Sequence, residues 1–120
     1  MSRHPIVHFE IGCRDGDSTG EFLSKLFDWD IVPAGPAQMI HTGEGIDGHI
    51  SELADEWGNY VNVYVEVDDL DDYLKRATEL GGKVLVKPVT LPGQGSFAWF
   101  ATPEGNIMAL WKPEQPGSTS

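Results

Sequence analysis

Residues 60–67, Tyr-Val-Asn-Val-Tyr-Val-Glu-Val, decide the fold of this chain. Valines occupy every odd position, and tyrosine, asparagine or glutamate occupies every even one. In an extended chain the two sets point to opposite sides, so one face is apolar and the other is polar. Valine and tyrosine are also enriched in strands. The stretch is therefore predicted to form a strand with one apolar face.

A helix is predicted directly after this strand. Asp68 or Asp69 can cap it, and Gly81-Gly82 ends it. Its apolar residues recur at helical spacing on one stripe, at Leu70, Tyr73, Leu74, Ala77 and Leu80. Three more strands are predicted after the helix, separated by Gly- and Pro-containing turns, at residues 83–89, 96–102 and 106–112.

The first half of the chain has the same order of elements. Residues 6–13 alternate, with His8 and Glu10 on the polar face. Ser18 and Glu21 have the spacing of a capping box, which predicts a helix from about Ser18 to Asp28 with its aromatic residues, Phe22 and Phe27, in the core. Short strands are predicted near residues 31–32 and 39–40 and between residues 43 and 53.

The two halves can be laid over each other. An offset of 54 residues places Val7 on Val61 and His8 on Asn62. Towards the end of each half the offset becomes 60, which places His49 on Ala109. Both halves therefore read β-α-β-β-β, and the chain is predicted to be a pseudo-duplication.

Composition restricts the partners. The 120 residues include 8 Lys+Arg and 19 Asp+Glu, a net charge of −11, which disfavours nucleic acid and anionic membrane surfaces. The single cysteine, Cys13, cannot form an internal disulfide. No signal peptide and no apolar run of about 20 residues is present, so a cytoplasmic location is expected.

Five segments together resemble the vicinal oxygen chelate superfamily, which includes glyoxalase I, extradiol dioxygenases and bleomycin-resistance proteins. They are residues 8–15 (HFEIGCRD), 22–29 (FLSKLFDW), 64–70 (YVEVDDL), 80–84 (LGGKV) and 103–107 (PEGNI). The resemblance implies an α+β fold in which two βαβββ modules form a cup-shaped mixed sheet with helices on the convex side. The modules, 5–54 and 59–112, would form one glyoxalase-like domain, followed by a flexible tail, 113–120.

The resemblance also implies four positions for a divalent metal inside the cup: His8, His49, Asn62 and Ala109. Enzymes of the family commonly carry His or Gln on the first strands and Glu on the last ones. Ala109 offers no donor atom and Asn62 offers no charge, so a metal would be held weakly. His8 and His49 remain the candidate metal ligands, and no cofactor is assigned with certainty. The alternative for His8 is a hydrogen-bonded histidine in a polar cavity, and the alternative for His49 is an exposed turn.

Further candidate residues come from the polar and aromatic faces of the strands. Glu10 and Glu66 can act as general bases or as substitute metal ligands, with solvated surface carboxylates as the alternative. The predicted ligand-binding residues are an amide and three aromatic side chains, namely Asn62, Tyr64, Phe97 and Trp99. Alternation does not tell which face of the strand with Phe97 and Trp99 lines the cup, and core or dimer interface is the alternative for these rings.

Two functions remain open at this stage. The first is a module that binds a small organic ligand in an aromatic-lined cup without a complete metal site. The alternative is a metal-dependent lyase, isomerase or dioxygenase that uses His8 and His49. A structural dimer with a filled cup is a third possibility, and the resemblance implies a homodimer in each case.

Overall fold

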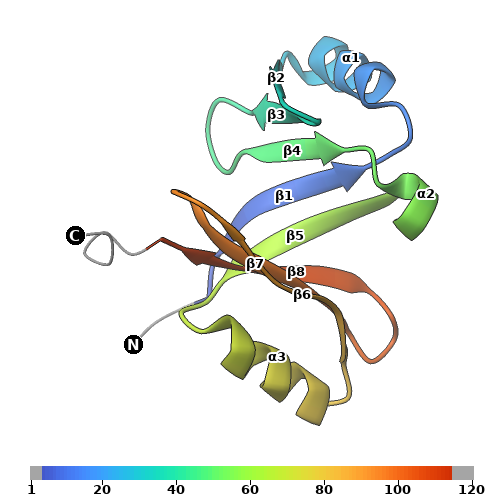
Figure 1. Cartoon of the computed structure of the whole chain (residues 1–120). Coiled ribbons are helices and arrows are strands. Elements are labelled where there is room, and N and C mark those ends of the chain that lie inside the picture. The colour runs from blue at the N-terminus through green and yellow to red at the C-terminus, as the bar shows by residue number, and fades with distance from the viewer. Residues whose placement is uncertain (1–3, 115–120) are drawn as a thin grey trace. The chain divides into compact units, whose positions relative to one another are not determined.

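The computed structural model describes residues 4–114. They form eight strands and three helices in an α+β arrangement (Figure 1). In chain order the elements are β1 (Ile6–Gly12), α1 (Gly16–Phe27), β2 (Asp30–Ala34), β3 (Ala37–His41), β4 (Gly48–Ser51), α2 (Ala54–Trp57), β5 (Tyr60–Glu66), α3 (Leu70–Glu79), β6 (Lys83–Leu91), β7 (Gly95–Ala101) and β8 (Ile107–Pro113). None of these helices has the length and apolarity that a membrane crossing requires.

The chain divides into two compact units within β5. The N-terminal unit is Val7–Val63, and the C-terminal unit consists of residues 4–6 and 64–114 of the described chain. The predicted modules instead placed the whole of β5 in the second half. The first residues of β5 join the N-terminal unit, where the hydroxyl group of Tyr60 donates a hydrogen bond to Glu10 at 2.6 Å.

The N-terminal unit has the strand order β2-β3-β4-β1. β1 and β4 are parallel, whereas β2, β3 and β4 pair antiparallel. Pro33 lies in β2, which is an edge strand, as the missing backbone donor of proline requires. The order β-α-β-β-β predicted for this half is confirmed.

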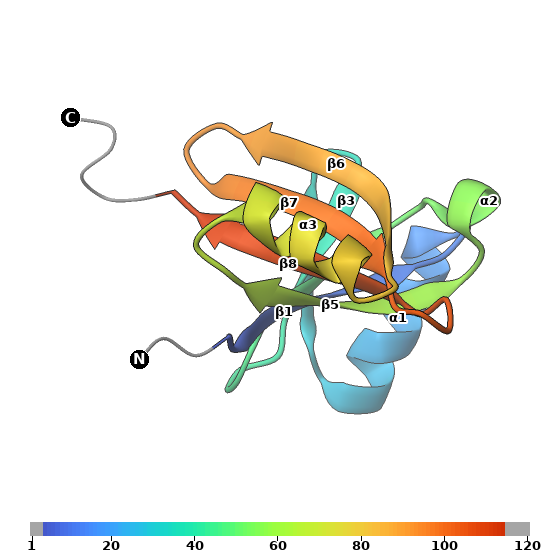
Figure 2. The ribbon, with the colours of Figure 1, turned by 90° about the horizontal axis from the view of Figure 1, so that it is seen from below.

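The C-terminal unit repeats this plan with the strand order β5-β8-β7-β6. Here β5 and β8 are parallel, and the other pairs are antiparallel. α3 lies across the face of β7 and β8 (Figure 2). The eight strands thus combine parallel and antiparallel pairing, and the predicted duplication of the β-α-β-β-β order is present. That the two modules enclose a cup with helices on its convex side stays a prediction, as does their description as one domain.

The predicted tail is described only at its start. Pro113 ends β8, and the backbone N–H of Glu114 donates to the carbonyl of Gln94 at 3.1 Å. These bonds make the first two residues of the predicted tail part of the fold, and residues 115–120 lie outside the described part of the chain.

Each unit has its own apolar core. Cys13, Ile40 and Ile50 form the buried centre of the N-terminal core, and Leu23 of α1 packs against it. The prediction that Phe22 and Phe27 lie in this core is wrong, because their exposed fractions are 63% and 52%. The helix instead turns its glycines, Gly16 and Gly20, towards the sheet, and this leaves the two rings outside.

The C-terminal core is built on α3. Leu70 and Leu74 are buried with Val67, Ala98 and Leu110, as the apolar stripe predicts. Leu80 was also predicted on that stripe, but it is 81% exposed. It lies at the helix C-cap, where the chain turns away through Gly81 at a φ of 102°.

The start of α1 also differs from the prediction. The N-cap is Asp15, whose carboxylate accepts the backbone N–H of Ser18 at 3.0 Å. Asp15→Ala should therefore lower the free energy of unfolding by about 1 kcal/mol, the usual contribution of such a cap. Ser18→Ala should change it by a few tenths of that, because the backbone N–H of residue 18 remains. Urea denaturation of both variants measures the difference, and a larger loss in Ser18→Ala would restore the predicted capping box.

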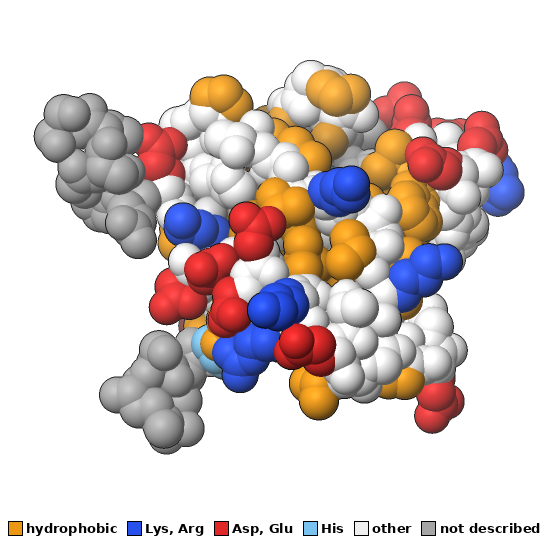
Figure 3. All heavy atoms as spheres, turned by 60° about the horizontal axis from the view of Figure 1, so that its bottom comes forward, with side chains coloured by type: hydrophobic (Ala, Val, Ile, Leu, Met, Phe, Trp, Pro, Cys, Tyr) orange, Lys and Arg blue, Asp and Glu red, His pale blue; other side chains and the backbone are white. Residues whose placement is uncertain are grey.

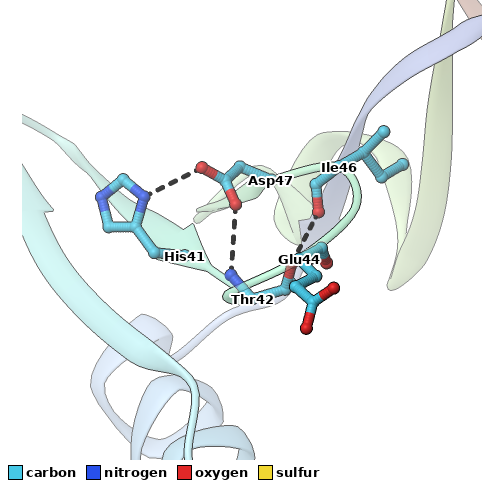
Figure 4. A network of polar contacts seen from close by, with 5 residues as sticks. All are labelled: His41, Thr42, Glu44, Ile46 and Asp47. Carbon is cyan, nitrogen blue, oxygen red and sulfur yellow. Dashed lines mark hydrogen bonds and ion pairs between the residues drawn. The ribbon is translucent and has the colours of Figure 1, made fainter.

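The turn between β3 and β4 fixes where β4 begins (Figure 4). Asp47 accepts the backbone N–H of Thr42 at 3.1 Å and contacts His41 Nδ1 at 3.0 Å. The hydroxyl oxygen of Thr42 lies 2.9 Å from the carbonyl of Ile46. The hydrogen bond with His41, followed by that with Thr42, lowers the pKa of Asp47. Asp47 immediately precedes β4, so this network ends directly before the strand that carries His49.

Candidate ligand site

In each unit, residues that are paired across three neighbouring strands form a row of side chains, and the two rows occupy corresponding positions in the two halves. In the N-terminal unit, Glu10 of β1 is in register with His49 of β4, which is in register with Met39 of β3. In the C-terminal unit the corresponding row is Tyr64, Ala109 and Trp99. Cross-strand partners point to the same face of a sheet. The offsets within these rows are 54, 60 and 60 residues, so the overlay predicted from the sequence is confirmed.

The N-terminal row is part of a chain of polar contacts. The hydroxyl group of Tyr60 donates to Glu10 Oε2 at 2.6 Å. The same oxygen lies 3.5 Å from His49 Nε2, and His49 Nδ1 lies 2.7 Å from His8 Nε2. The two imidazole rings stack with centroids 4.9 Å apart. Sequence reasoning selected His8, Glu10 and His49 separately, and the structure brings them together.

This series of polar contacts leads from the buried carboxylate of Glu10 to the more accessible imidazole rings. Glu10 is 1% exposed, whereas the side chain of His49 is 20% exposed. A contact of 2.7 Å between ring nitrogens requires that one donates and the other accepts. The histidine pair therefore carries at most one positive charge. Burial, followed by the neighbouring His49, lowers the pKa of His8 to about 4, so His8 is neutral at pH 7.

Tyr60 is the member of this chain that sequence reasoning did not select as a site residue. Its ring lies over Gly12, where an added Cβ atom would stand 2.0 Å from a ring carbon. The alternation in β5 already places Tyr60 and Asn62 on one face. The available signal was the glycine at the end of β1, which leaves room for a large ring on the neighbouring strand.

The aromatic candidates meet in the C-terminal unit. Trp99 Nε1 donates to the hydroxyl oxygen of Tyr64 at 3.3 Å, and Phe97 meets Tyr64 edge to face. Ala98, between Phe97 and Trp99, belongs to the core under α3, so the two rings point to the opposite face. Trp99 and Tyr64 are 3% and 6% exposed. Their role in ligand binding stays a prediction, and most of their surface already packs against the protein.

Asn62 and Glu66 lie on the same face of β5, two residues before and two residues after Tyr64. Asn62 is 0% exposed, and neither its amide nitrogen nor its amide oxygen has a hydrogen-bond partner among residues 4–114. Glu66 is partly buried at the end of β5, where its backbone N–H donates to the carbonyl of Pro5 at 2.9 Å. The ligand-binding role of Asn62 and the catalytic role of Glu66 stay predictions.

A cavity of about 580 Å³ lies elsewhere in the N-terminal unit, between α1 and the β2–β3 hairpin. Asp17, Glu21 and Glu52 line it together with small and apolar residues. Two of these carboxylates are already hydrogen-bonded, Glu52 to the N–H of Gly16 and Asp17 to Gln38. None of the residues predicted for the site lines this cavity.

The side chains do not fit the divalent ion that the family resemblance implies. His8 and His49 bind each other, and Asn62 brings no charge to offset an ion. Ala109 has no donor atom, and its row neighbours Tyr64 and Trp99 are hydrogen-bonded to each other. Within residues 4–114 no three His, Cys, Asp or Glu side chains gather in a metal-binding arrangement.

Several curated proteins are similar to this chain in sequence. The chain is 38% identical over 55 residues to the putative glyoxylase CFP32 of Mycobacterium tuberculosis, covering 46% of this chain and 21% of that protein. It is 27% identical over 124 residues to the anthracycline biosynthesis protein DnrV of Streptomyces peucetius, covering 87% of this chain and 45% of DnrV. The chain thus spans less than half the length of either relative. A glyoxylase-like domain-containing protein of Didymella fabae is 28% identical, with 88% of this chain and 91% of that protein covered.

Solved structures show the same fold at low identity. The protein BH1468 of Bacillus halodurans superposes with a TM-score of 0.69 at 11% identity, covering 98% of this chain and 99% of that chain. A glyoxalase/bleomycin resistance protein/dioxygenase superfamily member of Vibrio splendidus has a TM-score of 0.66 at 16% identity, covering 92% and 99%. The sequence profile of the same superfamily matches residues 5–110. This chain therefore belongs to the Glyoxalase/Bleomycin resistance protein/Dioxygenase superfamily.

Proposed function

We propose that this protein binds a small organic ligand at the polar face of its N-terminal unit, without a metal. The observation that carries the proposal is the amide of Asn62, which is fully buried and has no hydrogen-bond partner in the described part of the chain. Tyr60 lies two residues before Asn62 on β5, on the same face of the strand, and its hydroxyl group donates a hydrogen bond to Glu10. The amide of Asn62, the phenol of Tyr60 and the carboxylate of Glu10 therefore share one face. A ligand group that both donates and accepts would satisfy the amide.

The energetic argument concerns why asparagine stands at this position. Leaving a buried polar group without a hydrogen bond costs about 1–3 kcal/mol. Most buried polar groups in folded proteins are paired for this reason. Asn62 is thus costly in the unliganded protein, and residues of this kind are common at functional sites. Ligand binding with opening of the surrounding side chains would recover the cost.

Asn62→Leu tests the proposal, because leucine has the same number and branching of side-chain heavy atoms. We expect the free energy of unfolding to rise by about 1–3 kcal/mol as the unpaired amide is removed. Ligands found in a thermal-shift screen of the wild-type protein should bind this variant at least tenfold more weakly. Asn59→Leu is the control, because Asn59 is an exposed amide whose Oδ1 already accepts Arg14. A loss of stability in Asn62→Leu, with ligand binding unchanged, would refute the proposal.

The aromatic residues Tyr64, Phe97 and Trp99 remain proposed ligand contacts. DnrV is described as an anthracycline biosynthesis protein, and anthracyclines are polycyclic aromatic molecules. We therefore propose flat aromatic compounds as the first ligands to screen. Phe97 is the ring with the most accessible surface of the three, since it is only partly buried.

An enzyme is the second candidate function. Buried Glu10, next to His49 and Tyr60, is the observation that favours it, since a carboxylate in such surroundings can accept a proton from a bound molecule. Exchange of a carbon-bound hydrogen of the ligand with deuterium from D₂O would reveal this activity. The exchange should be lost in Glu10→Gln if Glu10 is the base. Lyase, isomerase and dioxygenase reactions that depend on a metal at His8 and His49 are not supported by the donor set described above.

We further propose that the chain forms a homodimer in the cytoplasm. Phe22 and Leu26 support the dimer, because they are 63% and 57% exposed and lie one turn apart on α1. Burying the Phe22 ring and the Leu26 side chain against a second copy would remove apolar surface from water. Light scattering should give twice the monomer mass for the wild-type protein and the monomer mass for the double variant Phe22→Glu, Leu26→Glu. A wild-type monomer at micromolar concentration would contradict the proposal.

A further inference from the structure

The two units differ strongly in charge. Residues 7–63 contain two basic and eleven acidic residues, so this unit has a net charge of 2 − 11 = −9. The remainder of the chain carries six basic and eight acidic residues, a net charge of 6 − 8 = −2. Figure 3 shows acidic and basic side chains close together on one face of the molecule. Most of the negative charge of the chain is therefore in the unit that holds Asn62 and Glu10.

Both basic residues of the N-terminal unit are paired at the surface. Arg14 Nε lies 3.2 Å from Asp55, and its side chain is 65% exposed. Lys25 Nζ lies 3.5 Å from Glu21, one helical turn away, and its side chain is 76% exposed. Neither contact involves a residue of the polar face. Within this unit the polar face therefore has no Lys or Arg to neutralise an anionic ligand.

The polar face itself carries a carboxylate at its centre. Glu10 is 1% exposed, and the hydroxyl group of Tyr60 donates a hydrogen bond to it. His8 and His49 share one hydrogen bond and so supply at most one positive charge. An anion entering this face would have to leave water next to a buried carboxylate, which is costly at low dielectric.

We propose that the ligand bound at this face is an organic cation, an amine attached to an apolar body, and that carboxylates and phosphates are excluded. The inference rests on the function proposed above and adds the ligand's charge. The field of the acidic unit attracts a cation and repels an anion before contact. The ring of Tyr60 and the Glu10 carboxylate provide a local environment in which an ammonium group is stabilised.

Three probes on one aromatic body test the inference: 2-(2-naphthyl)ethylamine, 2-naphthylacetamide and 2-naphthylacetate. Their charges are positive, zero and negative, whereas their apolar parts are the same. We expect the amine to bind at least tenfold more tightly than the acetate, with the amide between them. Titrations followed by naphthalene fluorescence at 20 and 300 mM NaCl should show that the advantage of the amine shrinks at high salt.

Variants distinguish the contribution of the Glu10 carboxylate to amine binding from that of the overall negative charge of the unit. Glu10→Gln should weaken the amine at least threefold more than the amide, whereas Asp28→Asn, which removes a charge at the exposed end of α1, should not. Asn62→Leu should weaken all three probes. If Glu10→Gln fails to fold, the comparison of the three probes on the wild-type protein at two salt concentrations remains decisive.

The outcomes distinguish the two proposals. Equal or tighter binding of the acetate, lost in Asn62→Leu, would overturn the cation preference and leave the binding site in place. Binding that Asn62→Leu does not change, or no binding of any probe, would overturn both. Tight binding of the amine with the predicted salt and Glu10→Gln effects supports both.

Discussion

Replacing Gly12 with alanine is expected to lower the free energy of unfolding by about 3–5 kcal/mol. The added Cβ atom would stand 2.0 Å from the ring of Tyr60, well inside contact distance. Overpacking of this kind costs about 1–3 kcal/mol. Moving the ring also breaks its 2.6 Å hydrogen bond to buried Glu10, and bonds to charged groups contribute about 1.5–3 kcal/mol.

Urea denaturation of four proteins isolates this effect: wild type, Gly12→Ala, Tyr60→Ala and the double variant. Because alanine at position 60 leaves room for the new methyl group, Gly12→Ala should cost much less in the Tyr60→Ala background. The cycle should therefore show a coupling of at least 2 kcal/mol between the two positions, as expected for residues in contact (roughly 0.5–3 kcal/mol). Gly35→Ala is the control, since nothing lies within 4 Å of its added Cβ atom. Additive effects at positions 12 and 60 would show that the ring does not lie over the glycine.

Acidification should destabilise the protein through His8. Its pKa in the folded protein is about 4, against 6.5 for a free imidazole, because burial and the neighbouring His49 disfavour its charged form. Between pH 6.5 and 4 the unfolded chain binds a proton at His8 that the folded protein does not, so stability falls as the pH falls. At 1.36 kcal/mol per pKa unit the full loss is at most about 3 kcal/mol, because His8 is only partly buried and solvent screens its charge, and it is complete below pH 4.

Free energies of unfolding measured at pH 7.5, 6, 5 and 4 test this expectation. His8→Gln keeps a group that can hydrogen-bond to His49 but cannot titrate, so its stability should fall less steeply over the same range. Subtracting the His8→Gln curve from the wild-type curve removes the contribution of the carboxylates to the pH dependence of stability. Asp47 is one of them, because its lowered pKa also favours the folded protein at higher pH. Parallel curves for wild type and His8→Gln would mean that His8 remains solvated in the folded protein.

Local sequence patterns predicted the elements because each depends on neighbours along the chain. The alternation of residues 60–67 gave β5, and the Asp68-Asp69 pair preceding an apolar stripe gave α3 with Asp69 as its N-cap. The same reasoning misplaced Phe22. The helical periodicity of α1 does not tell which side of the helix faces the sheet. In the structure the side with Gly20 faces it, because Gly20 approaches Ile31 and Gln38 closely.

The candidate site was predicted in its composition but not in its connections. Period-two alternation placed His8 and Glu10 on one face of β1, and comparison of the halves added His49 and Asn62. The hydrogen bond between His8 and His49 joins residues 41 apart in the chain, and the bond between Tyr60 and Glu10 joins residues 50 apart. Only strand register sets such distances, and no local pattern encodes them.

The sequence by itself thus determined the family, the repeated βαβββ order and the faces on which the polar residues lie, because backbone periodicity and capping act over a few residues. The tertiary structure alone decided that His8 and His49 bind each other and that Tyr60 packs on Gly12. It also decided that Asn62 is buried without a hydrogen-bond partner among the described residues. These features arise where strands distant in sequence pair, since burial and hydrogen bonding depend on every neighbour in space.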